Sequence, residues 1–298
     1  MKPTFFLLIV LFFTKASMAQ PLRMAVYQYA DNSRTQNLQP LALHLEKRLA
    51  IPVTVRSYPT VHALIKGMQN KEVDVAFIST FGYLLLQAGN ANHPMVPVTA
   101  LVAPNPDNNY RTAIVSRRDA ALSYLEDLHT QGTAKRMVFV ATGSTSGNLV
   151  PRLMMNGVGI RDADTHFSSV TYSGTHAQAL QTLLSGSADV AAMGSTEWEK
   201  LDTVQKKDLK LLELSAEIPL GPVLLTNELA PRIRDQVTAE LLSLHQSNAP
   251  ALEAIKAAWS EARQATHFVA ITEDYYRPFL SRLGTTEAVE AILKKFIQ

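Results

Sequence analysis

The sequence predicts an α/β protein with two similar lobes, in which strands and helices alternate along the chain. Three observations support this prediction. Apolar stretches of strand length alternate with stretches of helical spacing, one helix–strand unit occurs twice, and four strands end in Gly, Ser or Thr. Strands separated by helices are typical of parallel sheets covered on both faces. The length of 298 residues is enough for one large domain or two ordinary ones.

The first lobe is predicted to begin with a buried strand at 22–27. Leu41, Leu43 and Leu49 give 38–49 the spacing of a helix. Further strands are predicted at 53–58, 73–78 and 96–102, separated by helices at 61–68 and 81–87. The turn-rich stretch 103–109 follows, with two Pro and three Asn, and we expect the chain to cross to the second lobe there.

The second lobe continues the same alternation. Strands are predicted at 112–116, 136–141, 166–172 and 189–193, and helices at 123–129, 147–155 and 176–184. The final third is predicted to be mostly helical after one strand at 222–226. We therefore expect lobe 1 to comprise 20–111 plus about 216–298, and lobe 2 to comprise 112–215.

An internal repeat supports two lobes. His62 opens a helix that leads into an Asp-Val-Ala strand at 74–76 and a Ser-Thr pair at 79–80. His176 opens a second helix that leads into Asp-Val-Ala at 189–191 and Ser-Thr at 195–196. Two copies of one α/β unit suggest similar lobes, although two unrelated units can share this pattern by chance.

The first 19 residues have the features of a secretory signal. Lys2 precedes an apolar run at 5–13, and Ser17 and Ala19 are small residues placed for cleavage after position 19. The nine apolar residues are too few to span a bilayer, which takes about 20. An uncleaved anchor is the alternative. We expect residues 1–19 to be a cleaved signal peptide and the protein to be periplasmic.

Charge and cysteine content exclude several classes of function. Lys and Arg number 28 against 26 Asp and Glu, and both excess charges lie in the first 19 residues. In the rest of the chain the numbers of basic and acidic residues are equal, so the sequence has no basic cluster typical of nucleic-acid binding. We expect no nucleic-acid partner. Without cysteine there are no disulfides, thiolate metal sites or cysteine nucleophiles. No closely spaced histidine pair supports a metal site, no nucleotide-binding motif indicates a cofactor, and a monomer is expected.

Hydroxyl and glycine residues follow four predicted strands, at 79–80, 142–147, 173–176 and 194–196. Ligands of open α/β sheets bind at the carboxyl ends of the strands. Ser144, Thr145 and Ser146, bracketed by glycines, are able to surround an oxyanion at a helix N-terminus. Such residues also cap helices locally, and both roles remain open for each junction.

His176 has two interpretations: a structural histidine that opens a helix, or a donor to the same anion. If the charged imidazole donates, ligand binding should respond to pH near 6–7. No Lys or Arg lies in the four junctions, so hydroxyls and N–H groups are expected to hold the anion. Arg34 and Arg111 are the basic side chains to test otherwise.

The sequence gives little support for an enzymatic function. The loop 143–147 resembles a nucleophile elbow, but Thr145 occupies the position that such a motif gives to serine. A hydrolase that uses Ser146 and His176 is the remaining enzymatic alternative. We expect the protein not to be an enzyme.

From residue 20 onward, the chain resembles the periplasmic substrate-binding proteins of phosphate, phosphite and phosphonate ABC transporters, the PhnD-like group. The Ser-Thr-Ser-Gly element at 144–147 with the downstream Gly-Thr-His is the most specific match. The other matching stretches follow the family order: 22–27, 72–83, 110–115, 157–160, 187–193 and 272–278.

The resemblance implies a two-lobed type II periplasmic-binding-protein fold with the ligand in the cleft between the lobes. It implies that Ser144, Thr145, Ser146 and His176 hold a phosphorus oxyanion. Tyr29, Ser79 and Thr80 are the expected contacts from lobe 1, and Tyr83 is either another contact or a core residue. No carboxylate lies within 174–177 or 193–196, and the first one after them is Glu197, which argues against recognition of an amine.

The sequence therefore predicts capture of phosphonate, phosphite or phosphate for an ABC-transporter permease in the membrane. The alternative is a ligand-sensing subunit that serves a two-component histidine kinase.

Overall fold

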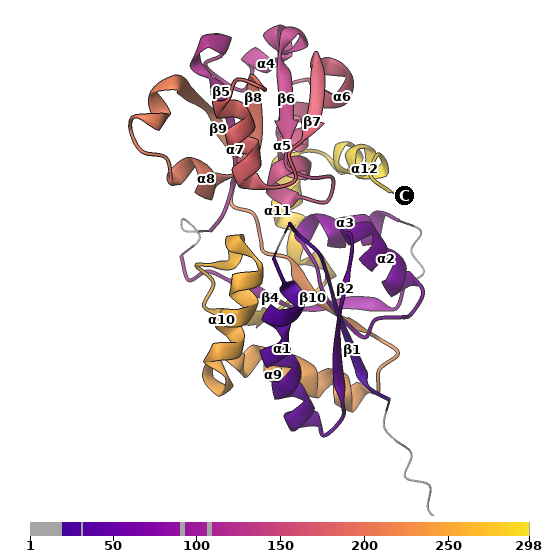
Figure 1. Ribbon diagram of the computed structural model, residues 1–298. Helices are drawn as coiled ribbons and strands as arrows, with labels where there is room; N and C mark the ends of the chain where they lie inside the picture. Colours follow the sequence, from indigo (N-terminus) through magenta and orange to yellow (C-terminus); the bar gives the residue numbers. More distant parts are fainter. Residues whose placement is uncertain (1–19, 31, 90–92, 106–108, 298) are drawn as a thin grey trace, which may run out of the picture.

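The chain forms two separate β-sheets, each flanked by helices. The computed structural model describes residues 20–30, 32–89, 93–105 and 109–297. Figure 1 shows one body around β1, β2, β4 and β10 and a second body around β5–β9. The expected signal peptide, residues 1–19, lies outside the described residues.

The six-stranded sheet has the order β11-β4-β10-β3-β1-β2. Its strands are β1 (Leu22–Tyr27), β2 (Val53–Tyr58), β3 (Val75–Phe77), β4 (Met95–Val102), β10 (Pro222–Thr226) and β11 (His267–Ala270). The helices of this part are α1 (Arg34–Leu49), α2 (Val61–Gln69), α3 (Thr80–Ala88), α9 (Pro231–Ser247) and α10 (Ala249–Ala258).

The five-stranded sheet has the order β7-β6-β8-β5-β9. Its strands are β5 (Thr112–Arg117), β6 (Arg136–Phe139), β7 (Ser169–Tyr172), β8 (Val190–Gly194) and β9 (Leu209–Leu214). The helices of this part are α4 (Asp127–Gln131), α5 (Val150–Gly157), α6 (Ala163–His166), α7 (His176–Leu184) and α8 (Ser195–Glu199). The lobe boundaries expected from the sequence remain a prediction.

Both sheets are mixed, so the prediction of parallel sheets is wrong in part. β1 pairs in parallel with β2 and β3, and β6 with β7 and β8. However, β10 runs antiparallel to β3 and β4, and β5 runs antiparallel to β8 and β9. Both β5 and β10 enter their sheet from the other sheet, without a crossover helix before them. Such strands start where the parallel strands end and therefore run in the opposite direction.

Several predicted elements need correction. The structure adds β9 and β11, two strands in a region expected to be helical or irregular. Helix α4 spans 127–131 and not the expected 123–129, because Asp127 accepts hydrogen bonds from the N–H groups of Ser123 and Tyr124. His166 ends α6 and does not begin a strand, and α1 starts four residues earlier than expected.

Alternate residues of the strands supply two core layers in each body, as the pleat of a strand requires. Met24 and Val26 of β1 pack in one cluster, whereas Ala25 and Tyr27 pack in the cluster on the other face. Phe139 and Val138 of β6 are divided between two further clusters in the same way. Each sheet therefore has its own core.

The C-terminal helices join the two bodies. Helices α11 (Arg277–Leu283) and α12 (Thr286–Lys294) follow the short helical turn η7 (Glu273–Tyr276). Helix α12 contacts both α3 and α5, and Figure 1 shows it at the junction of the two bodies. Beyond it, Lys295 pairs with Asp162 at 2.9 Å, and the Phe296 carbonyl lies 2.9 Å from His62 Nε2.

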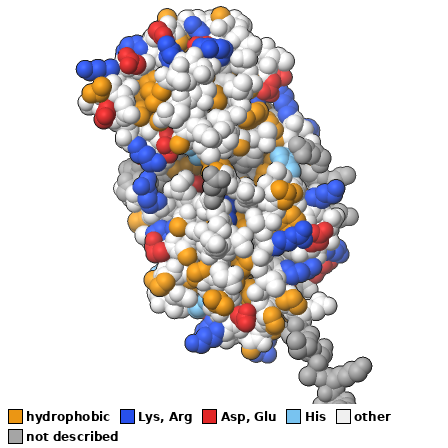
Figure 2. Space-filling model, in the orientation of Figure 1, with side chains coloured by type: hydrophobic (Ala, Val, Ile, Leu, Met, Phe, Trp, Pro, Cys, Tyr) orange, Lys and Arg blue, Asp and Glu red, His pale blue; other side chains and the backbone are white. Residues whose placement is uncertain are grey.

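Within the described residues, no helix is both long and apolar enough to cross a membrane. Figure 2 shows Lys and Arg side chains interspersed with Asp and Glu on one face of the molecule.

Candidate functional site

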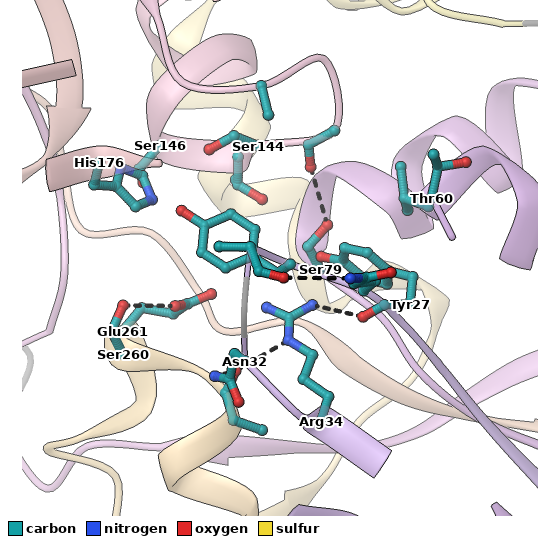
Figure 3. A pocket seen from close by; sticks show the side chains of 18 of the residues that line it. Tyr27, Asn32, Arg34, Thr60, Ser79, Ser144, Ser146, His176, Ser260 and Glu261 are labelled. Carbon is teal, nitrogen blue, oxygen red and sulfur yellow. Dashed lines mark hydrogen bonds between the residues drawn. The ribbon is translucent and has the colours of Figure 1, made fainter. Parts of the chain in front are cut away.

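A cavity of about 310 Å³ lies where the two sheets face each other across the junction. One side of it comes from the loops after β6 and β7, and the other from the loops after β1 and β2 and the turn after α10. Figure 3 shows Ser144, Ser146 and His176 opposite Arg34 and Asn32. The remaining polar lining residues are Tyr27, Gln28, Tyr29, Thr60, His62, Ser79, Tyr110, Thr142, Thr145, Ser260 and Glu261.

The hydroxyl loop at 142–147 forms a helix start that faces this cavity. Ser144 caps the turn, and its Oγ accepts a hydrogen bond from the N–H of Gly147 at 3.1 Å. The first turn, η4 (Thr145–Leu149), is π-helical and runs directly into α5. The first N–H groups of a helix lack partners within the helix. The hydroxyl hydrogen of Ser144 and the N–H groups of this turn are therefore suited to an anion.

A buried polar brace holds the hydroxyl loop from behind. The Asn148 side chain is fully buried; its Nδ2 donates to the Thr142 carbonyl at 3.0 Å, and its Oδ1 accepts from Arg152 Nε at 2.8 Å. Arg152 in turn donates to both carboxylate oxygens of Asp164, at 2.8 and 2.7 Å. The loop geometry is thus fixed by side chains that point away from the cavity.

His176 lies in the cavity as a neutral donor. It follows Gly174, whose φ of 90° suits glycine, and Thr175, which caps α7. Its Nδ1 accepts a hydrogen bond from the N–H of Gly194 at 2.9 Å. A backbone N–H can only donate, so Nδ1 carries no proton and Nε2 carries it. Burial also lowers the pKa of His176. The structure therefore favours a neutral ring over a charged imidazole, with Nε2–H as the group available to donate to a ligand.

The pKa of His176 predicts a direction for the pH dependence of stability. The folded-state pKa lies below the unfolded value of about 6.5, so the unfolded chain binds more protons in this range. Stability contributed by the neutral ring is present above that pH and is lost as pH falls through the folded-state pKa. Urea unfolding of wild type and His176→Gln at several pH values should show their difference in stability shrinking in acid. A difference that grows in acid would contradict the neutral assignment.

Tyr29 and Ser79 approach the site from the other side. The Tyr29 hydroxyl lies near the backbone of His176 but has no hydrogen bond of normal geometry, and burial raises its pKa. Its ring centre is 6.3 Å from that of His176. Ser79 Oγ caps α3 by accepting from the N–H of Gly82 at 3.1 Å and donates weakly to the Gly143 carbonyl at 3.4 Å.

Thr145, although it lines the cavity, also joins the two bodies. Its Oγ1 accepts a hydrogen bond from the N–H of Phe81 at 3.0 Å, and its side chain is almost fully buried. One acceptor position of this hydroxyl is therefore used to hold the start of α3 against the hydroxyl loop.

Thr80 and Tyr83 lie outside the cavity. Thr80 Oγ1 donates to the Pro219 carbonyl at 2.7 Å, and the residue is buried. Tyr83 packs against Tyr276 at 5.3 Å between ring centres and lines a separate groove of about 720 Å³ beside α11 and α12. This groove is larger, but several carboxylates line it, among them Glu273, Asp274 and Glu287, which makes it unsuited to an anion. The core interpretation of Tyr83 fits the structure.

Two charged residues line the cavity: Arg34, which the sequence offered only as a basic side chain to test, and Glu261, which was not predicted. Arg34 is the first residue of α1, and Glu261 lies in the turn η6 (Ser260–Ala262) after α10. Helices α1 and α10 pack side by side, which brings both residues to the cavity. The predicted site residues all come after strands, whereas neither Arg34 nor Glu261 follows a strand directly. Among the described residues, no group of three or more His, Asp or Glu side chains is placed to hold a metal ion.

Two α/β bodies with a polar cavity at their junction define a ligand-binding protein of the type II periplasmic class. A family model for the periplasmic substrate-binding proteins of phosphonate ABC transporters matches residues 24–276. The chain therefore belongs to this family, whose members deliver a substrate to a membrane transporter.

Curated relatives agree with this assignment. A probable phosphite-binding protein of an ABC transporter, PhnD1 from Prochlorococcus marinus, is 23% identical over 202 residues, which are 65% of this chain and 66% of that protein. The phosphate-import protein PhnD from Mycolicibacterium smegmatis is 27% identical over 222 residues, 70% of this chain and 67% of that protein.

Solved structures share the fold. The binding component of an ABC phosphonate transporter from Pseudomonas aeruginosa is 20% identical with a TM-score of 0.66, covering 93% of this chain and 94% of that one. PhnD1 from Prochlorococcus marinus, crystallised with methylphosphonate, is 17% identical with a TM-score of 0.65, covering 87% and 96%. The predicted type II fold is thereby confirmed.

Proposed function

We propose that this protein captures a small phosphorus oxyanion, a phosphonate in the first place, and delivers it to an ABC-transporter permease. The observation that carries the proposal is the convergence of hydrogen-bond donors on one cavity. The Ser144 and Ser146 hydroxyls, the Nε2–H of His176 and the unpartnered hydroxyl of Tyr29 all line it. Donors without net charge can bind an oxyanion tightly and still release it.

The size of the cavity favours an oxyanion with a short substituent. About 310 Å³ is the lower end of the range for ligand pockets and corresponds to about ten waters. A bare phosphate or phosphite would leave much of this space to solvent. A small phosphonate would fill more of it, with its oxyanion at the hydroxyl loop.

Lobe closure is the proposed mechanism of capture. We propose lobe 1 as 20–111 plus about 216–298 and lobe 2 as 112–215, with the ligand drawing them together. Hinge closure around a ligand is a common motion of two-lobed binding proteins. The signal peptide at 1–19 and action as a monomer in the periplasm complete the proposal.

The geometry of His176 argues against the hydrolase alternative. A serine hydrolase needs a histidine whose Nε2 is free to take the serine proton and whose Nδ1–H is held by a carboxylate. Here Nδ1 accepts from a backbone N–H, which leaves the proton on Nε2. His176 is therefore a donor and not a base toward Ser146. The relatives named above are transport proteins, which favours a transporter over a sensor kinase as the partner.

Calorimetry on a ligand panel tests the proposed function. We expect methylphosphonate, phosphite or phosphate to bind in the submillimolar range. Ser144→Ala and Ser146→Ala should each weaken that binding by about 1–3 kcal/mol, because a charged ligand loses one hydrogen bond. Ser187→Ala, an exposed serine far from the cavity, is the control. Unchanged affinity in both cavity variants would refute this site, and absence of binding by the whole panel would refute the ligand class.

A further inference from the structure

Arg34 is a buried cation in the wall of the cavity. Its side chain is 4% exposed, although arginine is rarely buried without a partner. Figure 3 shows it on the side of the cavity that faces Ser144 and Ser146. As the first residue of α1, Arg34 also sits at the helix end where the dipole disfavours a positive charge. Helix stability alone therefore does not account for this arginine.

Neutral groups hold the guanidinium in place. Its Nε donates to the Ala258 carbonyl at 3.0 Å and its Nη1 to the Tyr27 carbonyl at 3.3 Å. The rings of Tyr27, Tyr29 and Trp259 surround it, with centres 4.6, 5.1 and 4.6 Å from Cζ. Aromatic faces attract a cation without neutralising it. Within the described part of the chain, no carboxylate forms a salt bridge with Arg34, so its charge is left uncompensated.

Glu261 lines the same cavity and carries the opposite charge. Its Oε2 accepts a hydrogen bond from Ser260 Oγ at 3.5 Å, and it forms no salt bridge with Arg34 within the described chain. The cavity thus holds one fixed cation and one fixed anion that do not neutralise each other. Two other titratable groups lie near Arg34: burial raises the pKa of Tyr29 and lowers the pKa of His176, so both are neutral near pH 7.

We propose that Arg34 makes the cavity select an oxyanion by charge, so that a dianion binds in preference to an isosteric monoanion. This proposal rests on the proposed function, because it assumes that the oxyanion occupies this cavity. The two backbone carbonyls accept from Nε and Nη1 of Arg34, and Figure 3 shows the guanidinium pointing toward the part of the cavity below Ser144. The neutral donors of the cavity hold one charge of the ligand, and Arg34 attracts the second charge of a dianion. A monoanion lacks this second charge. The negative charge of Glu261 repels a dianion more than a monoanion and therefore reduces this preference.

Methylphosphonate and methanesulfonate give a direct test, because they share shape but differ in charge. At about pH 9, methylphosphonate is mostly a dianion and methanesulfonate a monoanion. Calorimetry on the full-length mature protein measures the ratio of the two affinities. Wild type should prefer methylphosphonate. Arg34→Gln should lower this ratio about tenfold or more, as expected for loss of a close charge pair, and Glu261→Gln should raise it by roughly threefold or more.

Matched variants separate charge selection from a structural role. Arg48→Gln removes an exposed arginine from the same helix and should leave the ratio unchanged. Arg34→Lys keeps the charge and should keep most of the preference. If Arg34 is only structural, Arg34→Gln weakens both ligands equally, and an unchanged ratio overturns the proposal. If Arg34→Gln does not fold, Arg34→Lys decides, because loss of the preference in a variant that keeps the charge would overturn charge selection.

The experiment also distinguishes failure of this proposal from failure of the proposed function. Equal binding of the two ligands by wild type would overturn charge selection and leave oxyanion capture intact. Binding of neither ligand by wild type would overturn both.

Discussion

Replacing Asn148 by alanine should lower the free energy of unfolding by about 2–3 kcal/mol, because two buried hydrogen bonds are lost together. Asn148 is fully buried and connects Arg152 Nε to the Thr142 carbonyl. Without it, the buried Arg152 keeps its bonds to Asp164 but has an Nε–H without a partner. Unfolding in urea, followed by circular dichroism, measures this change. Ligand affinity should fall as well, because the hydroxyl loop loses its anchor.

Two further variants show whether the brace or a general packing defect is responsible. Asn156→Ala changes the same residue type on α5, the helix that continues directly from the turn of Asn148, and the Asn156 side chain is half-buried. It should alter stability by less than about 0.5 kcal/mol. Asn148→Asp keeps an acceptor for Arg152 and loses only the donor to Thr142, so its effect should be intermediate. Equal loss from Asn148→Ala and Asn156→Ala would show that the brace has no special role.

The alternation of strands and helices was predictable because each parallel strand of the two sheets is followed by a helix that covers it. The strands that break this pattern were the ones missed or misjudged. β9 has the sequence Leu-Lys-Leu-Leu-Glu-Leu, in which apolar residues suit a helix or a strand equally. β11 has only four residues, which is too short for periodicity to show. Both lie at sheet edges, where pairing with a neighbour decides the conformation.

The part of the site built from strand ends was accessible from the sequence. One cavity is lined by five residues that follow predicted strands, as expected from the sequence: Tyr29, Ser79, Ser144, Ser146 and His176. That they bind the ligand remains a prediction. Thr80 and Tyr83 follow the same rule but point elsewhere, because one turn of helix rotates Tyr83 into the core beside Tyr276. Strand ends define a region, and helical rotation decides which side chains face it.

The proximity of Arg34 and Glu261 could not be predicted from local sequence patterns. They lie more than 200 positions apart, in or next to helices that contact each other through apolar side chains. Their arrival in one cavity depends on the packing of α1 against α10, where Asn37 Nδ2 donates to the Ala254 carbonyl at 3.0 Å. No spacing rule within either helix encodes that contact.

Lobe closure leads to a second large expected effect, at Gly143. In the structure, a Cβ at Gly143 would lie 2.5 Å from Val61 Cγ1, far closer than atoms of this kind approach each other. Gly143 lies in the hydroxyl loop and Val61 begins α2, so the two bodies meet at this point. Gly143→Ala should therefore oppose closure and weaken ligand binding by about 1–3 kcal/mol, the usual penalty of an inserted methyl group.

The steric explanation predicts a rescue. Val61→Ala removes the methyl group that clashes, so the double variant Gly143→Ala/Val61→Ala should bind like Val61→Ala alone. Gly157→Ala is the matched control, because a Cβ there meets nothing within 4 Å. X-ray scattering with saturating ligand should show that Gly143→Ala stays more extended than wild type, whereas the double variant becomes compact. If Gly143→Ala keeps wild-type affinity and compacts fully, the lobes do not meet at Gly143 and Val61 in the bound state, and closure must use another contact.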